Sequence, residues 1–93
     1  MAIQMFTVIC DFNGETYVSQ FEGDNPERIA RQWAPMMQSE RPIPRSSTHI
    51  AKTLIRDLHD GFLPSPLDGL TNVWQSGTKV GRDYFTVTFV RSS

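Results

Sequence analysis

The dipeptide Asn13-Gly14 stands between two runs of residues in which apolar and polar side chains alternate. Asn and Gly tolerate the positive φ angles that a two-residue type I′ turn requires, and alternation with a period of two is typical of β-strands. The pattern predicts a β-hairpin over residues 5–21. A two-residue turn sets Phe12 opposite Glu15, and this pair fixes every other pair across the hairpin.

The two faces of this hairpin differ in chemistry. Side chains two residues apart share a face, in one strand over residues 5–12 and in another over residues 16–21. The core face is predicted to hold Phe6, Val8, Cys10, Phe12, Tyr17 and Phe21. The opposite face is predicted to hold Thr7, Ile9 and Val18. In this interpretation Cys10 packs as a small apolar side chain.

A first helix is expected after the hairpin. Asp24 or Asn25 is a suitable N-cap, and Pro26 suits the first turn because the N–H that proline lacks would have no partner there. Pro35 disfavours helical geometry at the residue before it. The helix is therefore expected to end or kink at Ala34.

A second helix is expected after a proline-containing loop over residues 38–45. Ser46 or Ser47 is its expected N-cap, and Gly61 is well placed to end it. Its apolar residues recur at helical spacing and form an amphipathic stripe. The stripe consists of Ile50, Ala51, Leu54, Ile55 and Leu58.

Two more strands are expected over residues 70–76 and 84–90, after a loop over residues 63–69 and joined by a hairpin loop over residues 77–83. The order strand, strand, helix, helix, strand, strand predicts an α+β fold, a four-stranded antiparallel sheet with two helices on one face. The more apolar first and fourth strands belong in the middle, which gives the order 2-1-4-3. On the outer face we then expect Thr7, Ile9, Val18, Thr86, Thr88 and Val90.

Length and composition favour one domain over residues 1–93. Hydrophobic residues make 39% of the chain and charged residues 20%, which is too apolar for a disordered segment. The N-terminal residues lack the features of a signal peptide, and no apolar run reaches the roughly 18 residues of a membrane span. These observations predict a cytoplasmic protein without membrane contact.

Charge is distributed unevenly along the chain. Residues 1–40 carry six acids and two bases, whereas residues 41–93 carry seven bases and four acids. On the second helix, the spacing of the basic side chains places them on one stripe. The stripe consists of His49, Lys52, Arg56 and His59. It is either a contact for phosphate or an acidic protein surface, or an ordinary solvated helix face, and the net charge of −1 argues against nucleic acid.

Catalytic and metal-binding patterns are not found in the sequence. The glycines form neither a phosphate-binding loop nor a nucleophile elbow, and the two histidines stand ten residues apart without a neighbouring ligand pair. Asp57 and Asp60 flank His59 at helical positions that do not face it. The sequence therefore predicts no catalytic residue, no metal and no cofactor.

Two surfaces remain as candidates for binding. The outer face of the sheet is more apolar than a plainly solvated face, which is typical of a contact with a partner protein or a second copy of the chain. Trp74 is expected on an edge strand, where it serves either the core or an interface.

Parts of the sequence resemble known bacterial proteins. The stretch from Phe6 to Trp33, with its Thr16-Tyr17-Val18-Ser19-Gln20 strand, and the later Leu70-Thr71-Asn72-Val73-Trp74 resemble small uncharacterised bacterial α+β proteins. The strand, Gly turn, Tyr-containing strand and helix are also similar to HicB-type antitoxins. Those antitoxins usually carry a third strand and a Pro-Gly segment before the helix, whereas here residues 21–24 lead straight into it.

Taken together, these patterns predict a non-catalytic protein-binding domain of bacterial type, a toxin-neutralising immunity or antitoxin-like protein among the options. Its partner is another protein or a second copy of the chain. The alternative is a small enzyme or ligand-binding domain with a site near His59 and the loop over residues 62–69.

Overall fold

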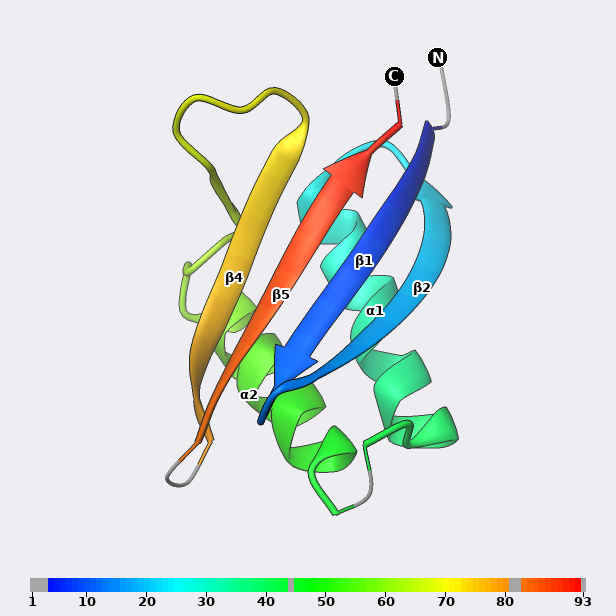
Figure 1. Ribbon diagram of the computed structural model, residues 1–93, viewed down its shortest axis with the longest axis vertical. Coiled ribbons are helices and arrows are strands. Elements are labelled where there is room, and N and C mark those ends of the chain that lie inside the picture. Colours follow the sequence, from blue (N-terminus) through cyan, green and yellow to red (C-terminus); the bar gives the residue numbers. More distant parts are fainter. Residues whose placement is uncertain (1–3, 44, 81–82, 93) are drawn as a thin grey trace.

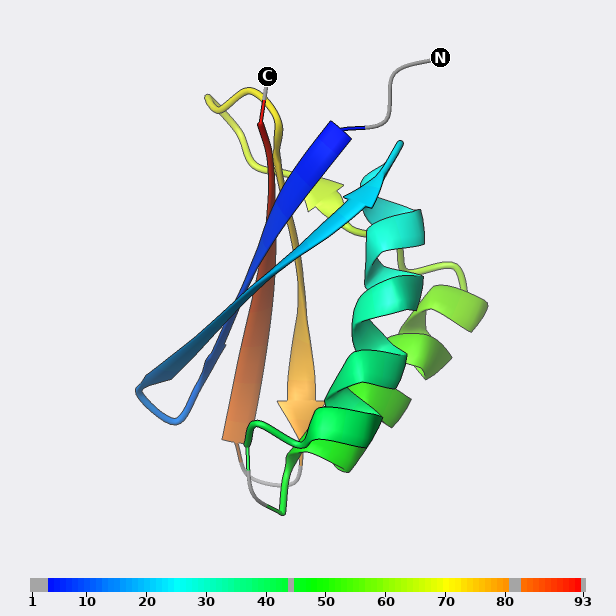
Figure 2. The ribbon, with the colours of Figure 1, turned by 90° about the vertical axis from the view of Figure 1, so that its right-hand side faces the viewer.

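A five-stranded antiparallel sheet and two helices form the part of the chain that the computed structural model describes, residues 4–43, 45–80 and 83–92. The strands lie in the order β2-β1-β5-β4-β3, and both helices pack on the same face of the sheet (Figures 1 and 2). The elements in chain order are β1 (Gln4–Phe12), β2 (Glu15–Gly23), α1 (Pro26–Glu40), α2 (Ser47–His59), β3 (Ser65–Pro66), β4 (Val73–Val80) and β5 (Asp83–Arg91).

The expected α+β architecture is confirmed, but the strand count is wrong. The four expected strands lie in the expected relative order, and a fifth strand, β3, pairs with Gln75 and Trp74 of β4. A two-residue segment that contains proline has no alternating pattern, so β3 is not predictable from the sequence pattern. Because β3 covers the edge of β4, the expectation that Trp74 lies on an edge strand is wrong as well.

The last hairpin is tighter than expected. β4 extends to Val80 and β5 begins at Asp83, so most of the loop expected over residues 77–83 belongs to strands, and residues 81–82 lie outside the described part. Gly77 was interpreted as a loop residue but pairs with Thr86 inside the ladder. A Cβ atom at Gly77 would stand 2.8 Å from the Phe85 carbonyl oxygen, which explains glycine within a strand here.

The register of the first hairpin agrees with the prediction. Phe12 is paired with Glu15, Cys10 with Tyr17, and the ladder continues without a bulge. Both turn residues have positive φ, 50° at Asn13 and 77° at Gly14. The turn sequence therefore determines which side chains face the helices.

The core lies between the sheet and the two helices. β1 is central because it pairs with β2 on one side and β5 on the other. Its inward side chains pack with those of β5 and with the apolar stripes of the helices. The buried set includes Phe6, Val8, Cys10, Phe12, Ile29, Trp33, Met37, Ile50, Leu54, Leu58, Phe85, Val87 and Phe89.

Helix α1 begins as expected and ends later than expected. The Asn25 side chain accepts a hydrogen bond of 2.9 Å from the Arg28 N–H, as an N-cap should. The helix then continues through Pro35 to Glu40, so of the expected end or kink at Ala34 the end is wrong. Pro35 is exposed, while the buried side chains of Trp33 and Met37 hold the helix on both sides of it. Burial of two such side chains, about 2 kcal/mol each, outweighs the roughly 3 kcal/mol that an internal proline costs.

Helix α2 is joined to the preceding loop by a buried hydroxyl. Ser46 occupies the N-cap position without a side-chain hydrogen bond, whereas the Ser47 hydroxyl accepts from the Ile43 N–H and donates to the Ile43 carbonyl, both at 2.8 Å. The helix ends at His59, and Gly61 follows with a φ of 91°, as its predicted role as a stop requires.

We predict that Gly14→Ala lowers the free energy of unfolding by about 1 kcal/mol, because alanine is strained at positive φ. A Cβ atom at Gly14 would meet no atom within 4 Å, so the effect comes from the backbone alone. Urea denaturation of both proteins measures it. Asn13→Gly at the neighbouring position is the control and should change stability by less than about 0.5 kcal/mol. Equal losses in the two variants would contradict a cost specific to Gly14.

Candidate functional site

The two edges of the sheet differ in how they are protected. Exposed edge strands invite pairing with other chains, and proteins usually guard them with very short strands, proline, lysine or bulges. The edge on the other side of the sheet consists of β3, Ser65 and Pro66, and of residues 76–80 of β4, which β3 does not cover and which include Lys79. The edge at β2 has nine residues in an unbroken register, without proline or lysine, and no described strand pairs with its outer side. β2 is therefore the unguarded edge.

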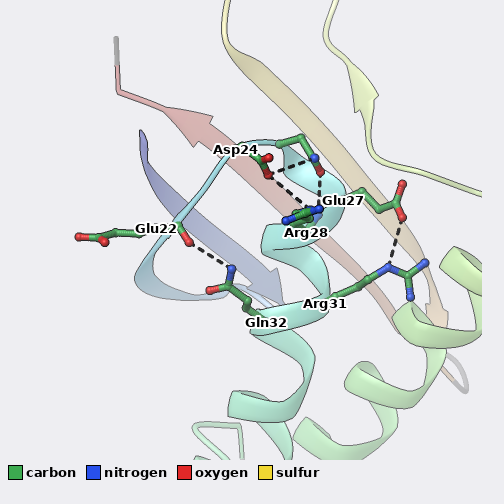
Figure 3. A network of polar contacts seen from close by, with 7 residues as sticks. Glu22, Asp24, Glu27, Arg28, Arg31 and Gln32 are labelled. Carbon is green, nitrogen blue, oxygen red and sulfur yellow. Dashed lines mark hydrogen bonds and ion pairs between the residues drawn. The ribbon is translucent and has the colours of Figure 1, made fainter. Parts of the chain in front are cut away.

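The backbone groups that point outward from β2 follow from the hairpin. The pair that flanks a type I′ turn exchanges backbone hydrogen bonds, and such pairs alternate along the ladder. Odd-numbered residues of β2 therefore bond to β1, and Thr16, Val18, Gln20 and Glu22 point their N–H and C=O groups outward. The Glu22 carbonyl agrees with this assignment, because it accepts a hydrogen bond of 3.1 Å from the Gln32 amide on α1 (Figure 3).

That bond also marks where the open edge ends. Gln32 satisfies Glu22, and two ion pairs, Arg28 with Asp24 and Arg31 with Glu27, lie at the same end of α1, the second of them on the other side of the helix (Figure 3). The stretch of β2 with outward groups available to a partner is residues 16–20.

A groove of about 420 Å³ lies between this edge and the C-terminal half of α1. Its wall on β2 is formed by Tyr17, Ser19 and Phe21, whose side chains face the helices and are half-buried. Ser19 is the smallest of the three and stands between two aromatic rings. The rest of the wall is formed by Trp33, Met36, Met37, Glu40 and Pro42.

On the outer face of the sheet, the structure brings together the residues that the sequence predicted there. No element of the described chain covers this face (Figure 2). Thr7 is paired with Val90, and Ile9 with both Val18 and Thr88. The polar side chains partly bond to one another, as in the bond of 3.2 Å from Gln20 to Thr7. Apolar side chains on this face remain accessible to a partner, and Val18 is 63% exposed.

Trp74 is half-buried and held from both sides. Its ring packs against Phe6, with 6.0 Å between the centroids, and the Arg91 guanidinium lies 5.4 Å from the ring centre. Arg91 is itself fixed by a side-chain hydrogen bond to Asn72. Of the two roles left open for Trp74, packing against the core agrees with these contacts.

The basic stripe of α2 is exposed. His49, Lys52 and Arg56 line a shallow depression of about 270 Å³, and His59 does not contribute to it. The stripe is separate from the β2 edge, because α2 packs next to β4 whereas α1 packs next to β2.

A larger cavity, of about 500 Å³, lies between the end of α2, the following loop and β4. Asp57, Phe62 and Ser76 are among its lining residues. The Ser76 hydroxyl is buried and has no hydrogen-bond partner within the described residues. His59 does not line this cavity, so a site in this region would not be built around that residue.

Cys10 is buried in the core, as expected. Burial, and to a smaller extent the neighbouring Asp11 carboxylate, raises the pKa of its thiol to about 12. A thiol with so high a pKa stays protonated at neutral pH, and the thiolate is the nucleophilic form. Cys10 therefore acts as a packing residue.

Among residues 4–43, 45–80 and 83–92, no three His, Cys, Asp or Glu side chains lie close enough to hold a metal ion. No helix in that part of the chain has the length and apolar character of a membrane span.

Comparison with protein-family models, with curated proteins and with solved structures gives no match. The function is therefore inferred from the surfaces described above.

Sequence reasoning missed the groove beside β2. Ser19, Met36 and Glu40 lie in different elements, and their meeting depends on how α1 crosses the sheet. One local signal was present, the small Ser19 between Tyr17 and Phe21 on the inward face of a strand.

The raised pKa of Cys10 predicts a pH-dependent stability. The unfolded chain releases the thiol proton near pH 9 and the folded chain near pH 12, so the stabilisation is complete below pH 9 and is lost as the pH rises toward 12. Between pH 8 and pH 10, urea denaturation should show wild type losing about 1 kcal/mol more than Cys10→Ala. Tyr17 is present in both proteins, and its pKa is raised mainly by its hydrogen bond to Glu15 and least by Cys10, so most of its contribution cancels. Parallel pH profiles for the two proteins would contradict the prediction.

Proposed function

We propose that this chain is a non-catalytic protein-binding domain of the bacterial cytoplasm that receives its partner at the β2 edge. The observation that carries the proposal is the contrast between the edges: one side of the sheet carries Pro66 and Lys79, whereas β2 has neither proline nor lysine and presents the outward groups of residues 16–20 beside a groove. An edge strand binds another protein through main-chain hydrogen bonds, and a neighbouring groove adds side-chain selectivity.

The outer face extends this binding surface. Val18 belongs to both, since its backbone lies on the edge and its side chain stands on the outer face next to Ile9. A partner that pairs with β2 can therefore also cover the apolar part of the face, where Thr86, Thr88 and Val90 continue the surface.

We further propose that the partner is a toxin that this domain neutralises. Immunity proteins and antitoxins act by covering a surface of a toxin, which requires an exposed binding surface and no chemistry. The order of strand, Gly turn, Tyr-containing strand and helix, which resembles the opening of HicB-type antitoxins, favours this class.

A ligand-binding role for the cavity near residues 61–66 is the second candidate. The buried Ser76 hydroxyl without a partner favours it, because buried polar groups are normally hydrogen-bonded. Ser76→Ala should abolish binding of any ligand found by a thermal-shift screen of small polar metabolites. A screen without a hit on wild type would remove this candidate.

The proposed function predicts that partner capture depends on the outward N–H of Val18. Tagged wild type, Val18→Pro and Val18→Thr are used to recover proteins from the native host at equal concentration. Proline fits an outward edge position without breaking the pairing with β1, whereas threonine keeps both the N–H and the branched shape. We expect one protein, identified by mass spectrometry, to bind wild type and Val18→Thr and to be lost with Val18→Pro.

Circular dichroism and thermal melting must show that Val18→Pro is folded. Recovery of no specific protein by wild type, or equal recovery by folded Val18→Pro, would overturn the proposed role of the edge. Recovery of further copies of this chain alone would identify a homodimer instead.

A further inference from the structure

We propose that the partner contributes an extended segment that adds to β2 as an antiparallel sixth strand, with an apolar side chain in the groove and a basic residue at each end. This inference rests on the proposed function and specifies the chemistry of the partner. It follows from the shape of the groove, from the number of β2 residues with outward groups available, and from the acidic charge of the hairpin.

The groove determines where the apolar side chain of the added strand belongs. Paired residues in an antiparallel ladder point to the same face, so the residue opposite Ser19 faces the helices. There it lies between Tyr17 and Phe21, in the groove that Ser19 and Met36 also line. A leucine, methionine or phenylalanine would be buried there, and such burial contributes about 1.5–3 kcal/mol.

The open edge determines the length of the segment. Thr16, Val18 and Gln20 have outward N–H and C=O groups, whereas the Glu22 carbonyl is taken by Gln32. The added strand therefore makes its main-chain bonds over five residues of β2. Side chains beyond that stretch still reach the glutamates at the two ends of β2.

The charge of the hairpin argues for a basic segment. β1 and β2 together contain three acids, Asp11, Glu15 and Glu22, and no base. Glu40 adds a further acid beside the groove. The bases on α1, Arg28 and Arg31, are paired with Asp24 and Glu27, and Arg41 at its C-cap donates a hydrogen bond to the Gln38 carbonyl.

The same charges argue against a second copy of the chain. Pairing of β2 with β2 would bring two acidic edges together without a base on either strand. A foreign segment with lysine or arginine near Glu15 and Glu22 gains attraction at both ends instead, and opposite charges across a ladder are stabilising.

These positions combine into a sequence pattern. In an antiparallel strand, the residue opposite Glu22 comes first, the one opposite Ser19 three residues later, and the one opposite Glu15 four residues after that. The expected segment therefore reads basic, any, any, apolar, any, any, any, basic.

A displayed library of random octapeptides, selected on the full chain, tests this pattern. Enriched peptides should carry it, and fluorescence anisotropy gives their dissociation constants. We expect binding to weaken about tenfold or more in Val18→Pro, and as much in Met36→Lys, which places a charge in the groove. Val18→Thr should bind within about threefold of wild type. Hydrogen exchange should show the Val18 and Gln20 amides protected by peptide.

Several outcomes would overturn the inference. They are the absence of enrichment, enrichment of acidic peptides, and peptides that bind folded Val18→Pro or Met36→Lys as tightly as wild type. Self-association in sedimentation that Val18→Pro abolishes would identify a second copy as the occupant. If the display fails while partner capture still depends on the Val18 N–H, this inference falls and the proposed function stands. If neither peptide binding nor partner capture depends on the Val18 N–H, both this inference and the proposed function fall.

Discussion

The pairing of β1 with β5 joins the two ends of the chain into one sheet, and the remaining elements depend on it. Seven residue pairs connect these strands, from Phe6 with Arg91 to Phe12 with Phe85. They place the inward side chains of both strands in one row beneath the helices. Because β1 is also paired with β2, the Asn13-Gly14 turn controls the orientation of β2 relative to this central pair. A one-residue change of register would turn every side chain of β2 to the opposite face.

The parts of the fold that sequence reasoning predicted are those determined by neighbouring residues. Asn13-Gly14 set the hairpin register, Asn25 capped α1, and Gly61 marked the end of α2. These features depend on local backbone conformation, which a short pattern records. The central position of the first and last strands followed from their apolar character.

The parts that were missed depend on contacts between distant residues. Helix α1 passes Pro35 because Trp33 and Met37 are buried against the sheet, which the local rule for proline does not consider. β3 exists only as a partner of β4. The candidate site was found in part: Val18 and its outer-face neighbours were expected, whereas the groove arises where α1 meets β2.

The uneven charge along the sequence corresponds to two separate surfaces of the folded chain, one acidic and one basic. Of the acids of the first forty residues that form no ion pair within the described residues, three lie on the hairpin and Glu40 lies at the end of α1, while the basic stripe lies on α2, beside β4. Surface ion pairs such as those of α1 contribute only about 0.3–0.5 kcal/mol each.

Pro66 has a consequence for assembly that reaches beyond its own strand. Sheets that stay open on both sides can lengthen without limit as chains add to each end, which is how fibrils grow. Here one end of the sheet carries Pro66, which lacks an N–H, and Lys79 of β4, so the β2 end is the one suited to accept a strand. In the proposed complex one added strand occupies that end, so each chain takes a single partner and the complex has a fixed stoichiometry.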